Sequence, residues 1–228
     1  MNRSALTDLY PFLAGKVHDE VRLDAALAAS IADKARESRE VSERFFAAQS
    51  SVLLAAAHAV AQTYRGGGRL FCMGNGGSSC DAAHIAVEFL HPVTAGRPAL
   101  AALNLTADVT TLSAVANDVG FEHVFVRPLV ALARAGDTLI GVSTSGNSPN
   151  LVAAFAKARD LGLTTIGFAG NDGGRMVSSS YVDHCLVVPS NSVHRIQECH
   201  VAAYHILWDL VHTLLADDRG AARAGDIR

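Results

Sequence analysis

The stretch LFCMGNGGSS (70–79) decides the fold class of this chain. An apolar run ends there in a glycine-rich turn, and a stretch with helical spacing begins near Asp81. Similar short runs recur at 100–105, 138–143, 164–168 and 185–188, and helical stretches separate them at about 78–91, 108–116, 122–134, 148–161 and 172–180. Strands without polar alternation are typical of a parallel sheet that is covered on both faces. We therefore expect an α/β protein, a doubly wound three-layer αβα sandwich.

The residues before this pattern predict helices. Apolar side chains recur at helical spacing over about 17–35 and 38–64, and a triple glycine at 66–68 is expected to end the second helix. Another long helix is expected at about 192–216. We therefore expect an N-terminal helical extension (1–66), packed on an α/β domain (67–228). The first helix is amphipathic and lies outside the α/β pattern, so we expect it to make a helix–helix or subunit contact.

The composition excludes several classes of protein. Of 228 residues, 50% are hydrophobic and 18% are charged, which excludes intrinsic disorder. A net charge of −3 and an aromatic content of 6% argue against nucleic-acid and anionic-membrane partners. Four scattered cysteines without a CxxC pair suggest reduced thiols. Asp8 and Pro11 interrupt any signal peptide, and no apolar run is long enough to span a membrane, so we expect a cytoplasmic protein.

Two strand ends carry residues that suggest a phosphate site. The first run leads into the glycine loop GNGGSS (74–79), and the third leads into the serine loop STSGNSP (143–149). Glycines allow a close backbone approach, and hydroxyls with free amides at a helix start can hold an anion without a cation. Each loop alone also fits a plain turn, and Ser148 before Pro149 would make an ordinary helix cap. Two such loops at neighbouring strand ends favour a phosphorylated small molecule.

A group of potential metal ligands lies on two predicted helices. His84 and Glu88 are four residues apart and therefore share a face of the helix after the glycine loop. Gln197 and His205, eight residues apart on the last helix, share a broad face. These side chains suit a divalent metal of the zinc type, and Glu88 with a histidine equally suits proton transfer. The spacing alone also fits a chance pair in a packed helix.

The motifs occur together in one order: GNGGSSCDAAHIAVE (74–88), Asn117-Asp118, STSGNS (143–148), GNDGGRM (170–176) and RIQECHVAAYH (195–205). In this order they resemble the sugar isomerase (SIS) domain, and more narrowly the sedoheptulose-7-phosphate isomerases, or phosphoheptose isomerases. The resemblance covers about residues 36 to 216. It implies a five-stranded parallel sheet, a homotetramer with active sites near subunit interfaces, and ketose–aldose isomerisation through an enediol. The implied product is D-glycero-D-manno-heptose 7-phosphate.

The resemblance also implies roles for single residues. Glu88 would be the base and His205 the acid, and zinc would be held by His84, Glu88, Gln197 and His205. The substrate would be bound by Asn75, Gly76, Gly77, Ser78, Asn117, Asp118, Ser143, Thr144, Ser145, Ser148 and Gln197. One position departs from the family pattern, because Pro92 stands where these isomerases commonly carry an arginine. This loss of a cation leaves a different sugar phosphate open as the substrate.

Two other functions fit the same fold. A tetrameric relative that assists a bacterial replication initiator resembles this chain in its loops, but it lacks the His/Glu pair and the second histidine. This chain keeps His84, Glu88 and His205, which favours an enzyme. A regulatory SIS module fused to a DNA-binding region is the other alternative, and residues 1–66 offer no basic recognition helix for it.

Overall fold

The computed structural model describes residues 20–225, and the side chains of residues 24–216. Asp8, Pro11 and the predicted start of the first helix near residue 17 lie outside the described residues. The chain forms two compact units, Met1–Arg39 and Glu40–Arg228. The unit that holds the sheet therefore begins at Glu40, whereas the sequence suggests a boundary after residue 66.

The N-terminal helices are one helix. The sequence predicts a break between residues 35 and 38, which is wrong: α2 runs without interruption over Glu20–Arg65. No glycine or proline occurs between Gly15 and Gly66, so nothing in this stretch would end a helix. The predicted end at the triple glycine is confirmed. In the first unit, Leu27 and Ile31 lie one turn apart and are exposed, and the contact expected of them stays a prediction.

The same helix is long and apolar enough, by length and composition, to cross a membrane. Its residues 41–61 instead supply core side chains to the second unit, with Val41, Phe45, Leu53 and Val60 all buried there. A core helix of a soluble protein meets the same criterion of length and apolar content, so this feature does not by itself indicate a membrane span.

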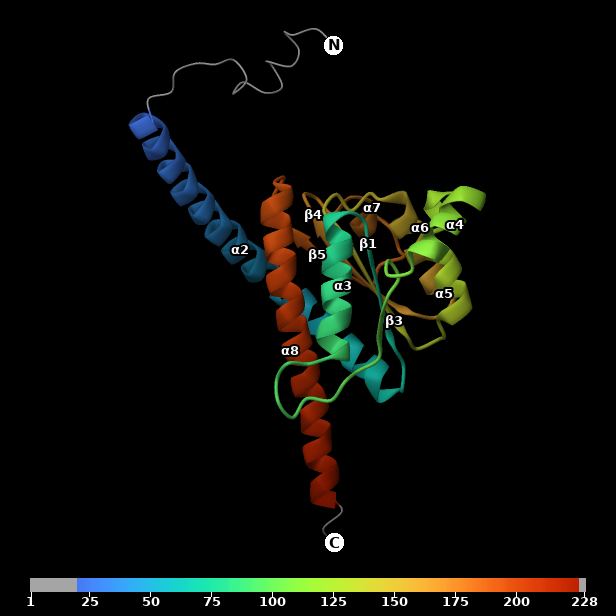
Figure 1. Ribbon diagram of the computed structural model, residues 1–228. Helices are drawn as coiled ribbons and strands as arrows, with labels where there is room; N and C mark the ends of the chain where they lie inside the picture. Colours follow the sequence, from blue (N-terminus) through green and yellow to red (C-terminus); the bar gives the residue numbers. More distant parts are fainter. Residues whose placement is uncertain (1–19, 226–228) are drawn as a thin grey trace. The chain divides into compact units, whose positions relative to one another are not determined.

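The sheet has five parallel strands in the order β2-β1-β3-β4-β5 (Figure 1). Every predicted run forms a strand: β1 (Leu70–Gly74), β2 (Ala102–Asn104), β3 (Thr138–Ser143), β4 (Thr164–Gly170) and β5 (His184–Val188). Leu70 pairs with Ala102 on one side and with Thr138 on the other. The predicted five-stranded parallel sheet is therefore confirmed.

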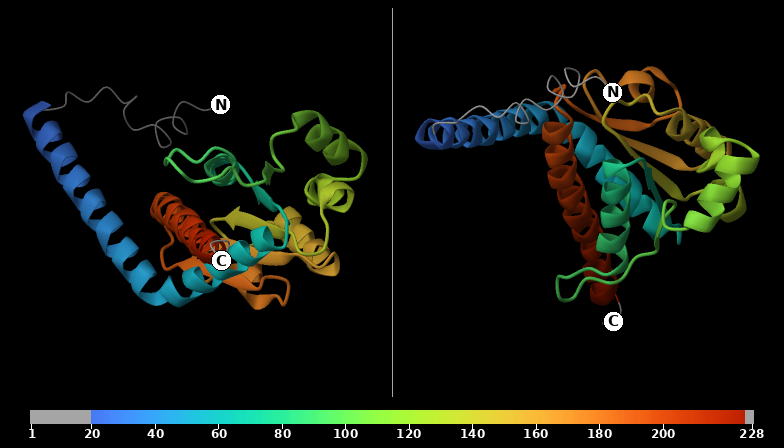
Figure 2. Two further views of the ribbon diagram at one scale, coloured as in Figure 1. Left: turned by 90° about the horizontal axis from the view of Figure 1, so that it is seen from below. Right: turned by 45° about the horizontal axis from the view of Figure 1, so that its top comes forward.

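Helices cover both faces of the sheet, as the sequence predicts (Figures 1 and 2). On one face, residues 41–61 of α2 pack with α3 (Gly77–Leu90) and α8 (Val193–Gly225). On the other face lie α4 (Val109–Asp118), η2 (Phe121–His123), α5 (Val126–Leu132), α6 (Pro149–Asp160) and α7 (Gly174–Ser178). Successive residues of a strand point to opposite faces. Leu70 and Cys72 accordingly join the first core, and Phe71 and Met73 join the second.

The topology locates the site. The strand order reverses between β1 and β3, which are neighbours in the sheet. The chain leaves β1 toward α3 on one face and leaves β3 toward α6 on the other. The two loops therefore diverge at the carboxyl ends of adjacent strands, which is the place where sheets of this kind bind ligands.

Candidate functional site

The glycine loop turns the chain from β1 into α3. Gly76 has φ 54°, in the left-handed region that glycine tolerates, and no side chain caps the helix start. Ser78 N and Ser79 N donate to Asn75 O and Gly76 O. Asn75 also exchanges two side-chain amide hydrogen bonds with Asn150, each of 2.9 Å. Asn150, the second residue of α6, was not singled out from the sequence, where it follows Ser148 and Pro149 as an ordinary helix-start residue.

The serine loop joins β3 to α6. Ser148 occupies the capping position of α6, but its hydroxyl makes no capping bond and lies 3.1 Å from Ser143 Oγ. The alternative of an ordinary serine cap therefore does not describe this side chain. Ser145 Oγ accepts from Asn147 N, and Thr144 is half-buried. This loop gathers hydroxyls at the amino end of a helix, where the macrodipole favours an anion.

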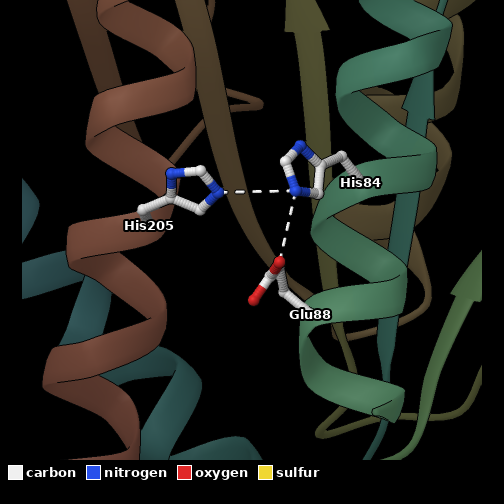
Figure 3. A group of neighbouring side chains, drawn as sticks. All are labelled: His84, Glu88 and His205. Atoms are coloured by element: carbon white, nitrogen blue, oxygen red, sulfur yellow. Dashed lines mark hydrogen bonds and ion pairs between the residues drawn. The ribbon is translucent and has the colours of Figure 1, made fainter. Parts of the chain in front are cut away.

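His84, Glu88 and His205 form one group between α3 and α8 (Figure 3). His84 Nε2 lies 3.2 Å from Glu88 Oε1 and 3.4 Å from His205 Nε2. One ligand atom from each residue lies within 4.8 Å of the others. The Glu88 side chain is 18% exposed and the His84 side chain 40% exposed, so the group is accessible from solvent.

The spacing of these atoms fits a metal. Two nitrogens that each lie about 2.0–2.1 Å from a tetrahedral zinc ion are roughly 3.3–3.4 Å apart. The 3.4 Å between the His84 and His205 nitrogens matches this spacing. Two imidazoles and one carboxylate are also a ligand set that zinc accepts at catalytic sites. The residues present therefore fit a divalent metal.

Gln197 lies at a different level of the two helices. Its Nε2 lies only 2.4 Å from the point where a Cβ on Gly77 would be, at the first residue of α3. His84 follows Gly77 by seven residues, which is about 10 Å along a helix. Gln197 is therefore placed beside the glycine loop, and its expected role as a fourth metal ligand stays a prediction.

Asn117 and Asp118 end α4 on the other face of the sheet from α3 and α8 (Figure 1). Both are exposed, and Asn117 Nδ2 donates to Asp118 Oδ1 over 2.7 Å. Within one chain they lie apart from the histidine group. Their expected place in the substrate site stays a prediction.

Other residues that sequence reasoning missed surround the group. Tyr204 is buried, and its hydroxyl lies 2.7 Å from His84 Nδ1. Trp208 Nε1 donates to the carbonyl of Glu88 over 2.8 Å and so satisfies the last turn of α3. Asp81 is buried one turn before His84, and burial raises the pKa of its carboxyl to about 6, although His84 lowers it in part. In the sequence, only the position of Tyr204 next to His205 could have indicated that one of these residues lies near the group.

Comparison with known proteins identifies the family. Residues 35–170 match the SIS domain family. The phosphoheptose isomerase of Roseiflexus sp. is 42% identical over 188 residues, which are 82% of this chain and 94% of that protein. The solved phosphoheptose isomerase of Neisseria gonorrhoeae is 34% identical with a TM-score of 0.76, over 82% of this chain and 99% of that one. That of Francisella tularensis is 31% identical with a TM-score of 0.78, over 82% and 98%. By its sequence and its fold, this chain belongs to the SIS domain family and, within it, to the phosphoheptose isomerases.

Proposed function

We propose that the protein isomerises sedoheptulose 7-phosphate to D-glycero-D-manno-heptose 7-phosphate. The observation that carries this proposal is the convergence of Glu88 with two histidines between α3 and α8. Ketose–aldose isomerisation moves a carbonyl between adjacent carbons, and it needs a base at carbon and an acid at oxygen. The membership in the phosphoheptose isomerases supports this choice of reaction.

Glu88 is the base in this proposal. Its carboxylate removes the proton from the carbon beside the ketose carbonyl, which gives an enediol, and a proton then returns to the neighbouring carbon. His205 moves protons at the two oxygens. Trp208 holds the backbone of Glu88, so the carboxylate is presented from an anchored turn of helix.

The serine loop binds the phosphate of the substrate. Ser143, Ser145 and Ser148 supply hydroxyl donors, with Thr144 between them. The glycine loop holds the sugar through Asn75, Gly76, Gly77 and Ser78, with Gln197 beside it. Binding energy from the phosphate, remote from the reacting carbons, then serves to orient the carbons against Glu88.

We infer that zinc is the cofactor, held by His84, Glu88 and His205, with Gln197 as the expected fourth ligand. A bound divalent ion would polarise the substrate oxygens and stabilise negative charge on them. Gln197 must leave its place beside Gly77 to join this set. Glutamine is also a poor zinc ligand, so we expect partial occupancy and sensitivity to chelators.

The protein works as a cytoplasmic homotetramer in this proposal, with no nucleic-acid or membrane partner. Val87 and Leu90 on α3 and Ile206 on α8 are between 40% and 49% exposed, which is apolar surface near the histidine group that a neighbouring subunit would cover. The four cysteines are free thiols, and three of them are buried or half-buried. Light scattering that finds a monomer at micromolar concentration would contradict this assembly.

The decisive experiment is an assay of C5 to C7 ketose phosphates for aldose formation, with and without a chelator. Sedoheptulose 7-phosphate should be the best substrate, and chelation should slow its turnover. Because Pro92 removes a cation that the family commonly carries, the panel also tests the length of the sugar. A chain that isomerises none of these compounds would favour the non-catalytic type of SIS protein.

A further inference from the structure

The turn of α3 that carries Glu88 is held from outside the helix. The last four carbonyls of an α-helix have no partner within it. In α3 the carbonyl of Phe89 accepts from Leu100 N over 2.8 Å, and that of Glu88 accepts from Trp208 Nε1 over 2.8 Å. The first bond comes from the loop 91–101, which joins α3 to β2, and the second comes from α8. The position of the Glu88 backbone therefore depends on where the indole of Trp208 lies.

An arginine from the same loop lies on that indole. The loop passes beside α8 on its way to β2 (Figure 1), and the guanidinium carbon of Arg97 lies over the Trp208 ring, 4.3 Å from its centroid. A cation within about 6 Å of an aromatic centroid is attracted to the face of the ring, and tryptophan is the strongest such partner. The Arg97 side chain is 21% exposed and Trp208 is 9% exposed. The pair is therefore largely shielded from water, which strengthens the attraction.

The ion pair that Arg97 also makes does not explain its placement. Arg97 Nη2 lies 2.5 Å from Asp209 Oδ1, but the Asp209 side chain is 58% exposed, and exposed ion pairs stabilise proteins little. Arg97 Nη1 is buried and has no hydrogen-bond partner within the described part of the chain. A donor that is buried without an acceptor costs stability, so hydrogen bonding alone does not favour this placement. The stacking on Trp208 is the contact that accounts for it.

We propose that Arg97 is a positioning residue for Glu88 and acts through Trp208; this rests on the isomerase function proposed above. Arg97 fixes the indole, the indole N–H fixes the carbonyl of Glu88, and this turn of helix presents the carboxylate to the substrate carbon. In this role Arg97 touches no reacting atom. A displacement of a reacting group by about 1 Å can cost about 10²-fold in rate. Loss of the stacking should therefore lower kcat, and KM should stay unchanged because the serine loop that is assigned to the phosphate is not disturbed.

Arg97→Lys isolates the stacking. Lysine keeps the positive charge that pairs with Asp209, but it lacks the planar group that stacks on an aromatic face. We expect kcat for sedoheptulose 7-phosphate to fall roughly tenfold with KM unchanged. Asp209→Asn removes the ion pair and leaves the stacking, so its kcat should stay within about twofold of the wild type. Arg159→Lys is the matched control, because Arg159 on α6 makes an ion pair of the same 2.5 Å length with Asp183, and it should change neither quantity.

The fluorescence of the protein reports the stacked pair directly, because Trp208 is the only tryptophan of the chain. In Arg97→Lys the emission should shift to longer wavelength, and acrylamide should quench it more strongly. In Arg159→Lys both quantities should match those of the wild type. This readout needs neither substrate nor activity. Unchanged emission and quenching in Arg97→Lys would overturn the proposal, because Arg97 would then not hold the indole.

Trp208→Phe separates a path through the indole from two independent effects. Phenylalanine keeps a ring for the guanidinium but loses the N–H that binds the carbonyl of Glu88, so kcat should fall at least as far as in Arg97→Lys. Because Arg97 acts only through this N–H, adding Arg97→Lys to Trp208→Phe should lower kcat no further. Three results would each contradict the proposal: effects that multiply, a KM that rises at constant kcat, or a kcat of Arg97→Lys within about twofold of the wild type.

Turnover of the wild type separates this inference from the isomerase proposal. An active wild type with an equally active Arg97→Lys variant would leave the isomerase standing and remove the role of Arg97. A wild type that isomerises no ketose phosphate would overturn the isomerase proposal and, with it, the role of Arg97 in the reaction. The fluorescence of the same samples would still decide whether Arg97 holds the indole.

Discussion

Asn75 and Asn150 exchange both of their side-chain amide hydrogen bonds, each of 2.9 Å, across the point where the strand order reverses. Asn75 belongs to the glycine loop after β1, and Asn150 to the first turn of α6 after the serine loop. Asn150 is 1% exposed, so water does not compete for these bonds. The pair therefore fixes the spacing between the loop assigned to the sugar and the loop assigned to the phosphate.

Asn150→Asp should break this coupling while it keeps the shape of the side chain. The carboxylate can still accept from Asn75 Nδ2, but it cannot donate to Asn75 Oδ1, and a buried oxygen then loses its partner. We expect the free energy of unfolding to fall by roughly 1–3 kcal/mol. We also expect kcat/KM for sedoheptulose 7-phosphate to fall, because the spacing between the glycine loop and the serine loop is no longer fixed. Asn191→Asp, at an exposed amide, is the control, and equal losses in the two variants would show that the pair has no special role.

The strands were predictable because each is short, apolar on both faces and followed by turn residues. Burial of β1 and β3 along their whole length is what such runs indicate. The serine loop and the His84–Glu88 pair could be located for a similar reason, since strand ends and a four-residue helical spacing are local features. Local sequence patterns were therefore enough to predict the sheet and those candidate site residues that lie close together in the sequence.

The remaining residues around the candidate site are brought there by contacts between segments that are distant in the sequence. Tyr204 meets His84 across 120 residues of chain, and Asn150 meets Asn75 across 75. The periodicity of apolar residues in the sequence does not predict such partners, because they depend on how α8 packs beside α3 and how β3 pairs with β1. The break predicted in α2 has a different cause, because it was inferred from weak apolar spacing between residues 35 and 38. A helix continues through such a stretch when no glycine or proline ends it.

Gly146→Ala should damage the serine loop. Gly146 has φ +64°, and a Cβ there would lie 2.1 Å from the carbonyl oxygen of Gly173. Gly67 has φ +74° with open space around it, so Gly67→Ala measures the backbone strain alone, about 1–2 kcal/mol. Gly146→Ala should cost more stability than that and should lower kcat/KM by roughly 10–10²-fold through displaced hydroxyls. Thermal melts and kinetics of both variants make the comparison, and equal kinetics would contradict it.

His200 should make the fold sensitive to acid. It is fully buried, its Nε2–H donates to Ala169 O over 3.1 Å, and burial lowers its pKa from 6.5 to about 4. Below about pH 6.5 the unfolded chain takes up a proton that the folded chain refuses, so stability falls as pH drops from 6.5 to 4. The full shift corresponds to roughly 3 kcal/mol.

His200→Gln keeps an amide donor for Ala169 and removes this titration. Its urea midpoint should therefore drop less than that of the wild type between about pH 7.5 and about pH 4.5. Asp81 acts in the opposite direction, since its pKa is raised to about 6 and the folded state binds its proton more readily. That contribution is common to both proteins and cancels in the difference. If the urea midpoints of the two proteins fell equally, the titration of His200 would not be the cause of the loss of stability in acid.

Glu88→Gln tests the base directly. Glutamine keeps the length of the side chain and an oxygen that can accept from His84, but it cannot remove a proton from carbon. Turnover should fall by roughly 10²–10⁴-fold. The bond from Trp208 is made to the backbone carbonyl of Glu88, so the last turn of α3 and the thermal midpoint should be retained. Glu122→Gln, at an exposed position of η2, is the control and should change neither quantity.

The two roles open to Glu88 give opposite results in this variant. If Glu88 only partners His84 in a packed helix, the substitution should cost stability and leave turnover intact. If Glu88 is the base, turnover should fall in a protein that melts and assembles as the wild type does. His205→Ala should lower turnover similarly, because the oxygens lose their proton carrier. A stable Glu88→Gln protein with near wild-type isomerisation would assign the base to another residue.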